Sequence, residues 1–125
     1  MATVLIVEDE FAIADLLKMA LTDEGYCVLT AANGRQGLTR LAEGPRPDLV
    51  ISDYMMPILD GVGMLQAMRG IESQRNIPCI VMSSMPEGNV RERIDGYAAF
   101  VHKPFQIAAV VQLVATILKN VRLGS

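Results

Sequence analysis

The chain has 125 residues, of which 51% are hydrophobic and 20% charged, and its formal net charge is −3 with a pI of about 5.0. This composition is typical of one globular domain with its own core, and it excludes a disordered chain. The acidic balance includes no Lys/Arg cluster, and no apolar run approaches the roughly 18 residues of a membrane span. We therefore expect a single domain over residues 1–125 that binds neither nucleic acid directly nor a membrane.

Apolar runs alternate along the chain with stretches of helical period. The predicted strands cover residues 3–7, 26–30, 49–52, 77–82 and 99–101. The predicted helices cover residues 11–22, 34–42, 61–69, 88–94 and 106–119. Strands that are apolar on both faces and alternate with helices are typical of a parallel sheet covered on both sides. The sequence therefore predicts an α/β, doubly wound fold.

The first and last predicted helices have different apolar patterns. We expect the inner face of the first helix to comprise Ile13, Leu16, Leu17, Ala20 and Leu21, with Gly25 placed to end the helix. One stripe of the last helix should cover the sheet and comprises Val110, Leu113 or Val114, Ile117 and Val121. A second stripe comprises Ile107, Val111, Ala115 and Leu118. It predicts a partner surface, unless the crossing angle buries both stripes or a C-terminal tail covers them.

The two cysteines, Cys27 and Cys79, each lie inside an apolar strand-like run. We expect both thiols to be buried and reduced. The chain also enters its first strand without a signal-like segment. These features predict a cytoplasmic location.

Polar side chains follow four of the predicted strands. Glu8 and Asp9 follow the first strand, Asp53 the third, Ser83 the fourth and Lys103 the fifth. A doubly wound sheet binds ligands at the carboxyl ends of its strands. Three carboxylates gathered there repel one another and invite a divalent cation. We hypothesise a hard-metal site beside a hydroxyl and an ammonium, built to place a phosphoryl group on Asp53.

Each of these residues also has a simpler role when taken alone. Glu8 and Asp9 could cap the first helix, and Asp53 could belong to an Asx turn. Ser83 could cap a helix, and Lys103 could be a solvated surface lysine. The joint interpretation is favoured because all of them fall on one edge of the predicted sheet.

The sequence resembles the receiver domain of bacterial two-component response regulators over essentially its whole length. The matching segments are residues 5–10, residues 47–57, the Asp60-Gly61 pair, residues 78–84 and residues 100–105. The resemblance implies a flavodoxin-like sandwich of five strand–helix units, with the strands in the order 2-1-3-4-5. It also implies a signalling phosphoacceptor that catalyses only its own phosphoryl transfer and autodephosphorylation, and not an enzyme acting on other substrates.

The resemblance assigns roles to the residues around the acids. Asp53 would accept a phosphoryl group from a histidine kinase or phosphotransfer protein, and Lys103 would bind the phosphate. Asp9, Asp53 and the backbone carbonyl of Met55 would hold Mg²⁺ (or Mn²⁺), with Glu8 acting through water.

The same resemblance implies a switch and an output surface. Ser83 matches the switch hydroxyl and Phe100 the switch aromatic, and the bond between Lys103 and Pro104 would be cis. The fourth helix, fifth strand and fifth helix would form a face for a homodimer or a target protein.

Two methionines extend the comparison to the lifetime of the phosphorylated form. Met55 and Met85 stand two residues after Asp53 and Ser83, where side chains of the family flank the path of the attacking water. Neither offers a group to orient that water, so we expect slow loss of phosphate, unless both simply fill gaps in the packing.

Two other functions compete with the phosphoacceptor. One is a receiver-like interaction module that works without phosphorylation, although the intact set of acids argues against it. The other is a phosphohydrolase with an aspartate nucleophile, a class that uses an Asp-x-Asp pair on the nucleophile strand. Asp53 has no such partner at that spacing. A flavin or nucleotide module is disfavoured because acids, and not a phosphate-binding loop, follow the first strand.

Overall fold

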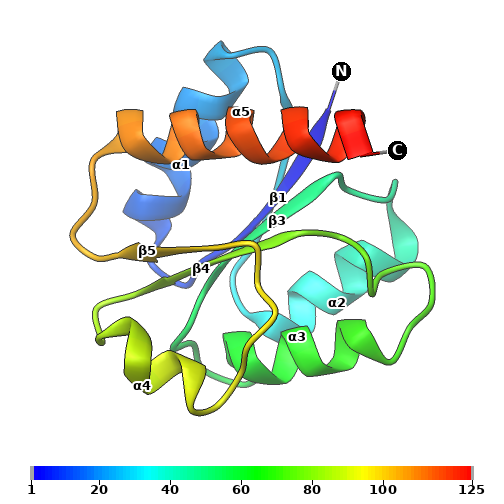
Figure 1. Cartoon of the computed structure of the whole chain (residues 1–125), viewed down its shortest axis with the longest axis vertical. Helices are drawn as coiled ribbons and strands as arrows, with labels where there is room; N and C mark the ends of the chain where they lie inside the picture. Colours follow the sequence, from blue (N-terminus) through cyan, green and yellow to red (C-terminus); the bar gives the residue numbers. More distant parts are fainter. Residues whose placement is uncertain (1, 125) are drawn as a thin grey trace.

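Five parallel strands of the described residues form one sheet in the order β2-β1-β3-β4-β5 (Figure 1). The computed structural model describes the backbone of residues 2–124 and the side chains of residues 2–121. The strands are β1 (Thr3–Val7), β2 (Cys27–Ala31), β3 (Leu49–Asp53), β4 (Cys79–Ser83) and β5 (Ala99–His102). The helices are α1 (Phe11–Asp23), α2 (Gly34–Glu43), α3 (Gly61–Arg69), α4 (Glu87–Arg91) and α5 (Ile107–Gly124). The predicted fold class and strand order are confirmed.

Helices cover both faces of the sheet, with α1 and α5 on one face and α2, α3 and α4 on the other (Figure 1). Successive residues of a strand point to opposite faces, so each strand contributes to two cores. In β1, Val4 and Ile6 join the core under α1 and α5, while Leu5 and Val7 join the opposite core. This two-sided burial explains why the strands are continuously apolar.

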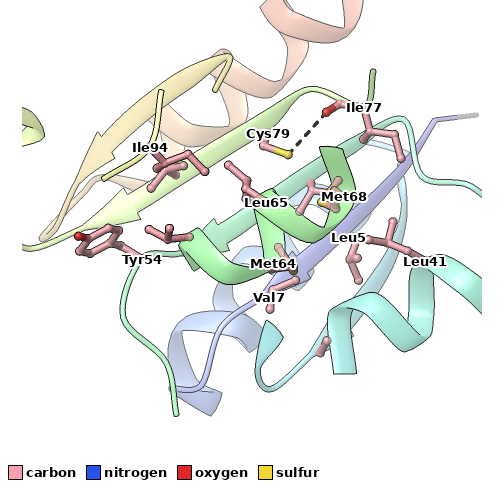
Figure 2. Close-up of a cluster of buried hydrophobic side chains, with 14 of the residues drawn as sticks. Leu5, Val7, Leu41, Tyr54, Met64, Leu65, Met68, Ile77, Cys79 and Ile94 are labelled. Carbon is pink, nitrogen blue, oxygen red and sulfur yellow. Dashed lines mark hydrogen bonds between the residues drawn. The ribbon is translucent and has the colours of Figure 1, made fainter. Parts of the chain in front are cut away.

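The core on the side of α2, α3 and α4 consists mainly of aliphatic and methionine side chains (Figure 2). Met64, Leu65 and Met68 of α3 are buried against the sheet. The buried thiol of Cys79 donates a weak hydrogen bond to the backbone oxygen of Ile77 at 3.5 Å. Burial raises the pKa of this thiol to about 12, so Cys79 is an unreactive core residue.

The expectation for the other cysteine is wrong, because Cys27 is exposed. Cys27 is the first residue of β2, which lies at the edge of the sheet and pairs only with β1. An edge strand has a neighbour on one side only, so its end is covered less well than that of a central strand.

The inner face of α1 is narrower than the sequence predicted. The buried residues of this helix are Ala14, Leu17 and Leu21. Leu16 is 55% exposed, so its predicted place on the inner face is wrong. Successive residues of a helix point about 100° apart, so Leu16 points to the side of α1 when its neighbour Leu17 points into the core. Gly25 adopts a φ of +94° just after α1, and it ends the helix as predicted.

The two apolar stripes of α5 merge at the sheet. The buried residues are Val110, Val114 and Leu118, which include one member of the second stripe. Ile107 and Val111 are also packed against the core, whereas Val121 of the first stripe is 47% exposed. The second stripe is therefore not the free apolar face that the sequence predicted, because the crossing of α5 buries most of both stripes.

Of the helices in the described chain, none combines the length and apolar character that a membrane crossing requires.

The α4 segment, residues 87–94, combines two buried side chains with polar contacts to its neighbours. Val90 and Ile94 are buried, and Figure 2 shows Ile94 and Tyr54 at one end of the cluster. The Arg93 guanidinium donates a hydrogen bond to the Tyr54 hydroxyl at 3.1 Å and lies 5.5 Å from the centre of its ring. It also lies 3.6 Å from the carboxylate of Asp60. These contacts connect α4 to the residue that directly follows β3.

A second polar group connects α4 to the loop before β5. The Tyr97 hydroxyl donates to the Glu87 carboxylate at 2.8 Å, and Arg91 pairs with the same carboxylate at 3.0 Å. The Tyr97 ring lies 6.4 Å from that of Phe100, centre to centre. The position of α4 is therefore linked to the position of the half-buried Phe100 side chain.

Candidate functional site

Three acidic side chains meet at the carboxyl ends of β1 and β3. These strands are neighbours, with Val7 opposite Ser52, so Glu8 and Asp9 emerge beside Asp53. One carboxylate oxygen from each acid lies within 4.8 Å of the other two. Glu8 and Asp53 are buried, whereas Asp9 is exposed. The structure thus brings together the acid cluster expected at this edge.

Lys103 reaches this acid cluster from the end of β5. Its Nζ lies 2.7 Å from Glu8 Oε1 and 3.0 Å from Asp53 Oδ1. Its side chain is only 14% exposed. Its backbone N–H donates to the carbonyl oxygen of Ser83 at 2.8 Å, which holds the end of β5 against β4. Lys103 is therefore a largely buried ion-pair partner, and the alternative of a solvated lysine is wrong.

Burial dominates the electrostatics of the cluster. Loss of solvation raises the pKa of Glu8 and of Asp53, although hydrogen bonds from Lys103 act in the opposite direction. Burial alone would lower the pKa of Lys103, but its hydrogen bonds to Glu8 and Asp53 outweigh this, so that pKa is raised. The ammonium is therefore firmly charged, while the carboxylates are short of compensating positive charge.

The donor set of the cluster fits a hard divalent cation. Three carboxylates share one ammonium, which leaves two negative charges without a partner inside the cluster when all are ionised. Carboxylate and carbonyl oxygens are the ligands that Mg²⁺ prefers. Met55, whose carbonyl was expected as a further ligand, lines the same cleft as Asp9 and Asp53.

Neither of the first two acids occupies the N-cap position of α1. Glu10 occupies the N-cap position of α1 and makes no side-chain capping hydrogen bond. Glu8 accepts a hydrogen bond from the backbone N–H of Glu10 at 3.1 Å. This bond turns the Glu8 carboxylate back toward the acid cluster.

The hydroxyl expected at the site is present beside the acids. Ser83 is buried at the end of β4 and lines the same cleft as Asp53. Its Oγ accepts a hydrogen bond from the N–H of Met85 at 2.9 Å, within the turn after the strand, and it does not cap α4. Phe100 lies further back on β5, packed against the core under α4, and does not line the cleft. The Lys103–Pro104 peptide is cis, as the resemblance implied.

The loop between β3 and α3 is pressed against the acid cluster. A side chain at Gly61 would collide with the backbone oxygen of Asp53, so only glycine fits there. Asp60 caps α3 by accepting the N–H of Gly63 at 2.9 Å. Ile58 has a φ of +71° and is 75% exposed. A β-branched residue rarely adopts this left-handed conformation, so the loop is strained, which no sequence pattern predicted.

A cleft of about 580 Å³ connects the acid cluster to an apolar wall. The polar end contains Asp9, Asp53, Ser83 and Lys103. The apolar wall is formed by Ile13, Leu16, Pro104, Phe105 and Ile107. The apolar pattern of α1 predicted Leu16 in the core, so this wall was not predicted. The spacing of Glu10, Ile13 and Leu16 was the available signal, since residues three apart share a helix face.

Comparison with known proteins identifies the family. A family model described as the response regulator receiver domain matches residues 4–115. The chain belongs to this family. Receiver domains are signalling phosphoacceptors that histidine kinases phosphorylate, and they bind Mg²⁺ in an acidic pocket. The receiver family predicted from the motifs is therefore confirmed.

The receiver resembles part of several longer regulators. It is 35% identical to the transcriptional regulatory protein PcoR of Escherichia coli, over 98% of this chain and 54% of that protein. It spans about half the length of the curated relatives that it matches. Those regulators therefore contain further regions that this receiver does not match.

Two solved receiver domains share the structure closely. One is the signal receiver domain of a signal transduction histidine kinase from Syntrophus aciditrophicus, with 34% identity, a TM-score of 0.87, and coverage of 97% of this chain and 92% of that one. The other is the receiver domain of a sensor histidine kinase from Pseudomonas aeruginosa PAO1, with 28% identity and a TM-score of 0.84, covering 94% of this chain and 98% of that one. In that protein a magnesium ion is coordinated in the active-site cleft.

Proposed function

We propose that Asp53 accepts a phosphoryl group from a histidine kinase or phosphotransfer protein, and that this receiver acts as a cytoplasmic signalling switch and not as an enzyme on other substrates. The observation that carries the proposal is the position of Lys103, 3.0 Å from Asp53 and 2.7 Å from Glu8. A buried ammonium beside a buried carboxylate is the arrangement that a phosphoryl acceptor needs, because the ammonium can pair with the negative charge of the phosphoryl group after transfer.

The residues divide the work of the transfer. The Asp53 carboxylate attacks phosphorus without first losing a proton. Lys103 then donates a hydrogen bond to a phosphoryl oxygen, and the Ser83 hydroxyl donates to another. Asp9, Asp53 and the carbonyl of Met55 would hold Mg²⁺ (or Mn²⁺), with Glu8 acting through water. When bound, that ion offsets the charge of the carboxylates and of the phosphoryl group.

Acetyl phosphate with Mg²⁺ tests the acceptor directly. We expect intact-protein mass spectrometry to show one added phosphoryl group in the wild type and none in Asp53→Asn. Asp48→Asn is the matched control, because Asp48 precedes the same strand at its opposite end, where it accepts the N–H of Thr3 at 2.8 Å. Equal labelling of Asp53→Asn and wild type would contradict the assignment. No labelling of either would favour the interaction module that works without phosphorylation.

In this proposal, a partner recognises the phosphorylated state by binding to the face formed by α4, β5 and α5. Two observations support this face: polar contacts link α4 to the loop before β5, and β5 is an edge strand. The occupant would be a second copy of the chain or a target protein, and not nucleic acid.

Sedimentation with and without acetyl phosphate tests for a homodimer at this face. We expect Ala115→Glu, an exposed change on α5, to reduce phosphorylation-dependent association while Asp53 is still labelled. Lys18→Glu, exposed on α1, is the control. If the wild type is monomeric in both states at high concentration, the homodimer is wrong and a target protein remains.

A further inference from the structure

The cleft at Asp53 is larger than a phosphoryl group and is apolar along one side. Its volume of about 580 Å³ lies within the range of small-molecule sites, which combine apolar walls with a few polar groups at defined positions. Here Asp9, Asp53, Ser83 and Lys103 form the polar end, and Glu10, just before α1, is the charged residue beside the apolar wall. A molecule with an apolar tail and an anionic head, the head held by Lys103 and by the divalent cation that the acids would bind, would match both ends at once.

The apolar wall combines two elements that are distant in the sequence. Ile13 and Leu16 come from α1, one helical turn apart, and the other members, Pro104, Phe105 and Ile107, lie between the end of β5 and the first residue of α5. Leu16 leaves 55% of its surface exposed, while Ile13, Phe105 and Ile107 are half-buried. Together they offer an apolar surface next to the charged reacting groups, so an apolar tail would gain by covering it.

We propose that this cleft binds small acyl phosphates through their acyl chains and uses them as phosphodonors, with a preference for chains longer than acetyl. The proposal rests on Asp53 being the phosphoacceptor. An Asp53 oxygen forms a bond to phosphorus as the bond breaks between phosphorus and the oxygen that bridges it to the acyl carbon of the donor. The leaving group departs as a carboxylate that takes the bonding electron pair, so no proton moves and no oxidant is needed. The products are Asp53 carrying the phosphoryl group and the free carboxylate of the donor.

The expected preference follows from burial of methylene groups. Full burial of one methylene corresponds to about a fourfold change in an equilibrium constant. Butyryl phosphate has two more methylenes than acetyl phosphate. Because one side of the cleft is open, we expect about a three- to tenfold gain in kcat/KM. The gain should appear as a lower KM with little change in kcat, because the tail is bound equally before and during transfer.

Phosphorylation rates with acetyl and butyryl phosphate test the preference. Both donors release a carboxylate of nearly the same basicity, so chemistry alone gives no preference. Leu16→Gln removes part of the apolar wall, and it should reduce the ratio of the two kcat/KM values toward one. Met19→Gln is the matched control, because Met19 is 58% exposed on the same helix but does not line the cleft. It should keep the ratio of the wild type.

The outcomes separate the donor proposal from the acceptor assignment. If acetyl phosphate labels Asp53 and butyryl phosphate is no better, the acceptor stands and the donor proposal is overturned, leaving the wall to a protein donor. It is also overturned if Leu16→Gln keeps the preference, or if Met19→Gln loses it equally. If neither donor labels Asp53, the acceptor assignment itself fails.

Discussion

The acid cluster and the α4 segment are neighbouring regions that are held in place by opposite means. The acids and Lys103 come directly from the ends of strands, and Lys103 bridges two of them with little exposure to solvent. The α4 helix has five residues, and the arginines that anchor it, Arg91 and Arg93, are 67% and 50% exposed at their side chains. Exposed ion pairs each contribute about 1 kcal/mol or less, whereas a buried pair that loses one partner costs several.

This difference separates chemistry from response. Phosphoryl transfer needs groups fixed to within a fraction of an ångström, which strand ends provide. A switch needs an element whose ties are weak enough to be exchanged, which α4 provides. Tyr54 belongs to both regions, since it follows Asp53 directly and its hydroxyl accepts the hydrogen bond of Arg93.

The largest expected effect is at the ammonium of the acid cluster. Lys103→Met should lower the free energy of unfolding by about 3 kcal/mol, because Glu8 and Asp53 stay buried without their cation. Chemical denaturation measures this loss. Lys18→Met, exposed on α1, should stay within about 0.5 kcal/mol of the wild type. A small loss in Lys103→Met would show that the acid cluster is held no more firmly than α4.

The loss at Lys103 should also depend on pH. Burial raises the pKa of Glu8 and Asp53 in the folded state above the unfolded values. Each ionised carboxylate therefore costs stability above its folded pKa, and the cost disappears as pH falls through that pKa. Without Lys103 both pKa values rise further, so the destabilisation should be greatest above the folded pKa values and should shrink as the pH falls through them.

Metal binding gives the next effect and sharpens the contrast. Mg²⁺ at ten times its dissociation constant should stabilise the wild type by about 1.4 kcal/mol, since it binds the folded chain. Asp9→Asn should weaken this stabilisation, because it removes one carboxylate of the acid cluster. Thermal shift with a chelator control measures it. Equal stabilisation of both proteins would place the ion elsewhere.

The lifetime of the phosphorylated form tests two methionines, of which Met55 lines the cleft and Met85 packs against the core on the side of α4. Exchanging Met55 for Asn and Met85 for Glu should speed loss of phosphate by about tenfold, because the new groups can orient a water molecule. Met55 is 59% exposed, so its exchange should not disturb the core. Mass spectrometry after removal of the donor follows the decay. Unchanged decay in the double variant would mean that these side chains do not control water.

The link through Tyr54 should give a local effect of about 1 kcal/mol. Tyr54→Phe removes the hydroxyl that accepts the hydrogen bond of Arg93. Hydrogen exchange should then be faster across residues 87–94 and unchanged in β1 and β3. Tyr26→Phe, beside the opposite core, is the control. Protection of α4 equal to that of the sheet in the wild type would remove the contrast between the two regions.

The smallest effect is a gain, at the strained loop. Ile58→Asn should raise the free energy of unfolding by about 0.5 kcal/mol, because asparagine tolerates the left-handed conformation better than a β-branched residue. Ile58→Val keeps the branch and should give no gain. If Asn lowers stability, the exposed Ile58 side chain contributes packing that outweighs its strain.

The strands and the members of the acid cluster follow from the sequence, because strands and their polar ends are local patterns, whereas the strand order came from the resemblance to the receiver family. Which side of a helix is buried depends on how that helix crosses the sheet. For that reason Leu16 was predicted to be buried but lines a cleft. Leu118, predicted on the outer stripe of α5, is buried, and Val121, predicted on the inner stripe, is exposed. The contact between Arg93 and Tyr54 joins residues 39 apart, and no sequence period encodes it.

The thiol of Cys27 gives the chain a single natural position for a probe. Cys79 is buried with a pKa of about 12, so a maleimide dye should modify Cys27 alone. Cys27 begins β2, and the acid cluster lies at the other end of the sheet, about 16 Å along a five-residue strand. A fluorophore there can report tumbling and association without touching the acids or the α4 segment, and no cysteine needs to be engineered.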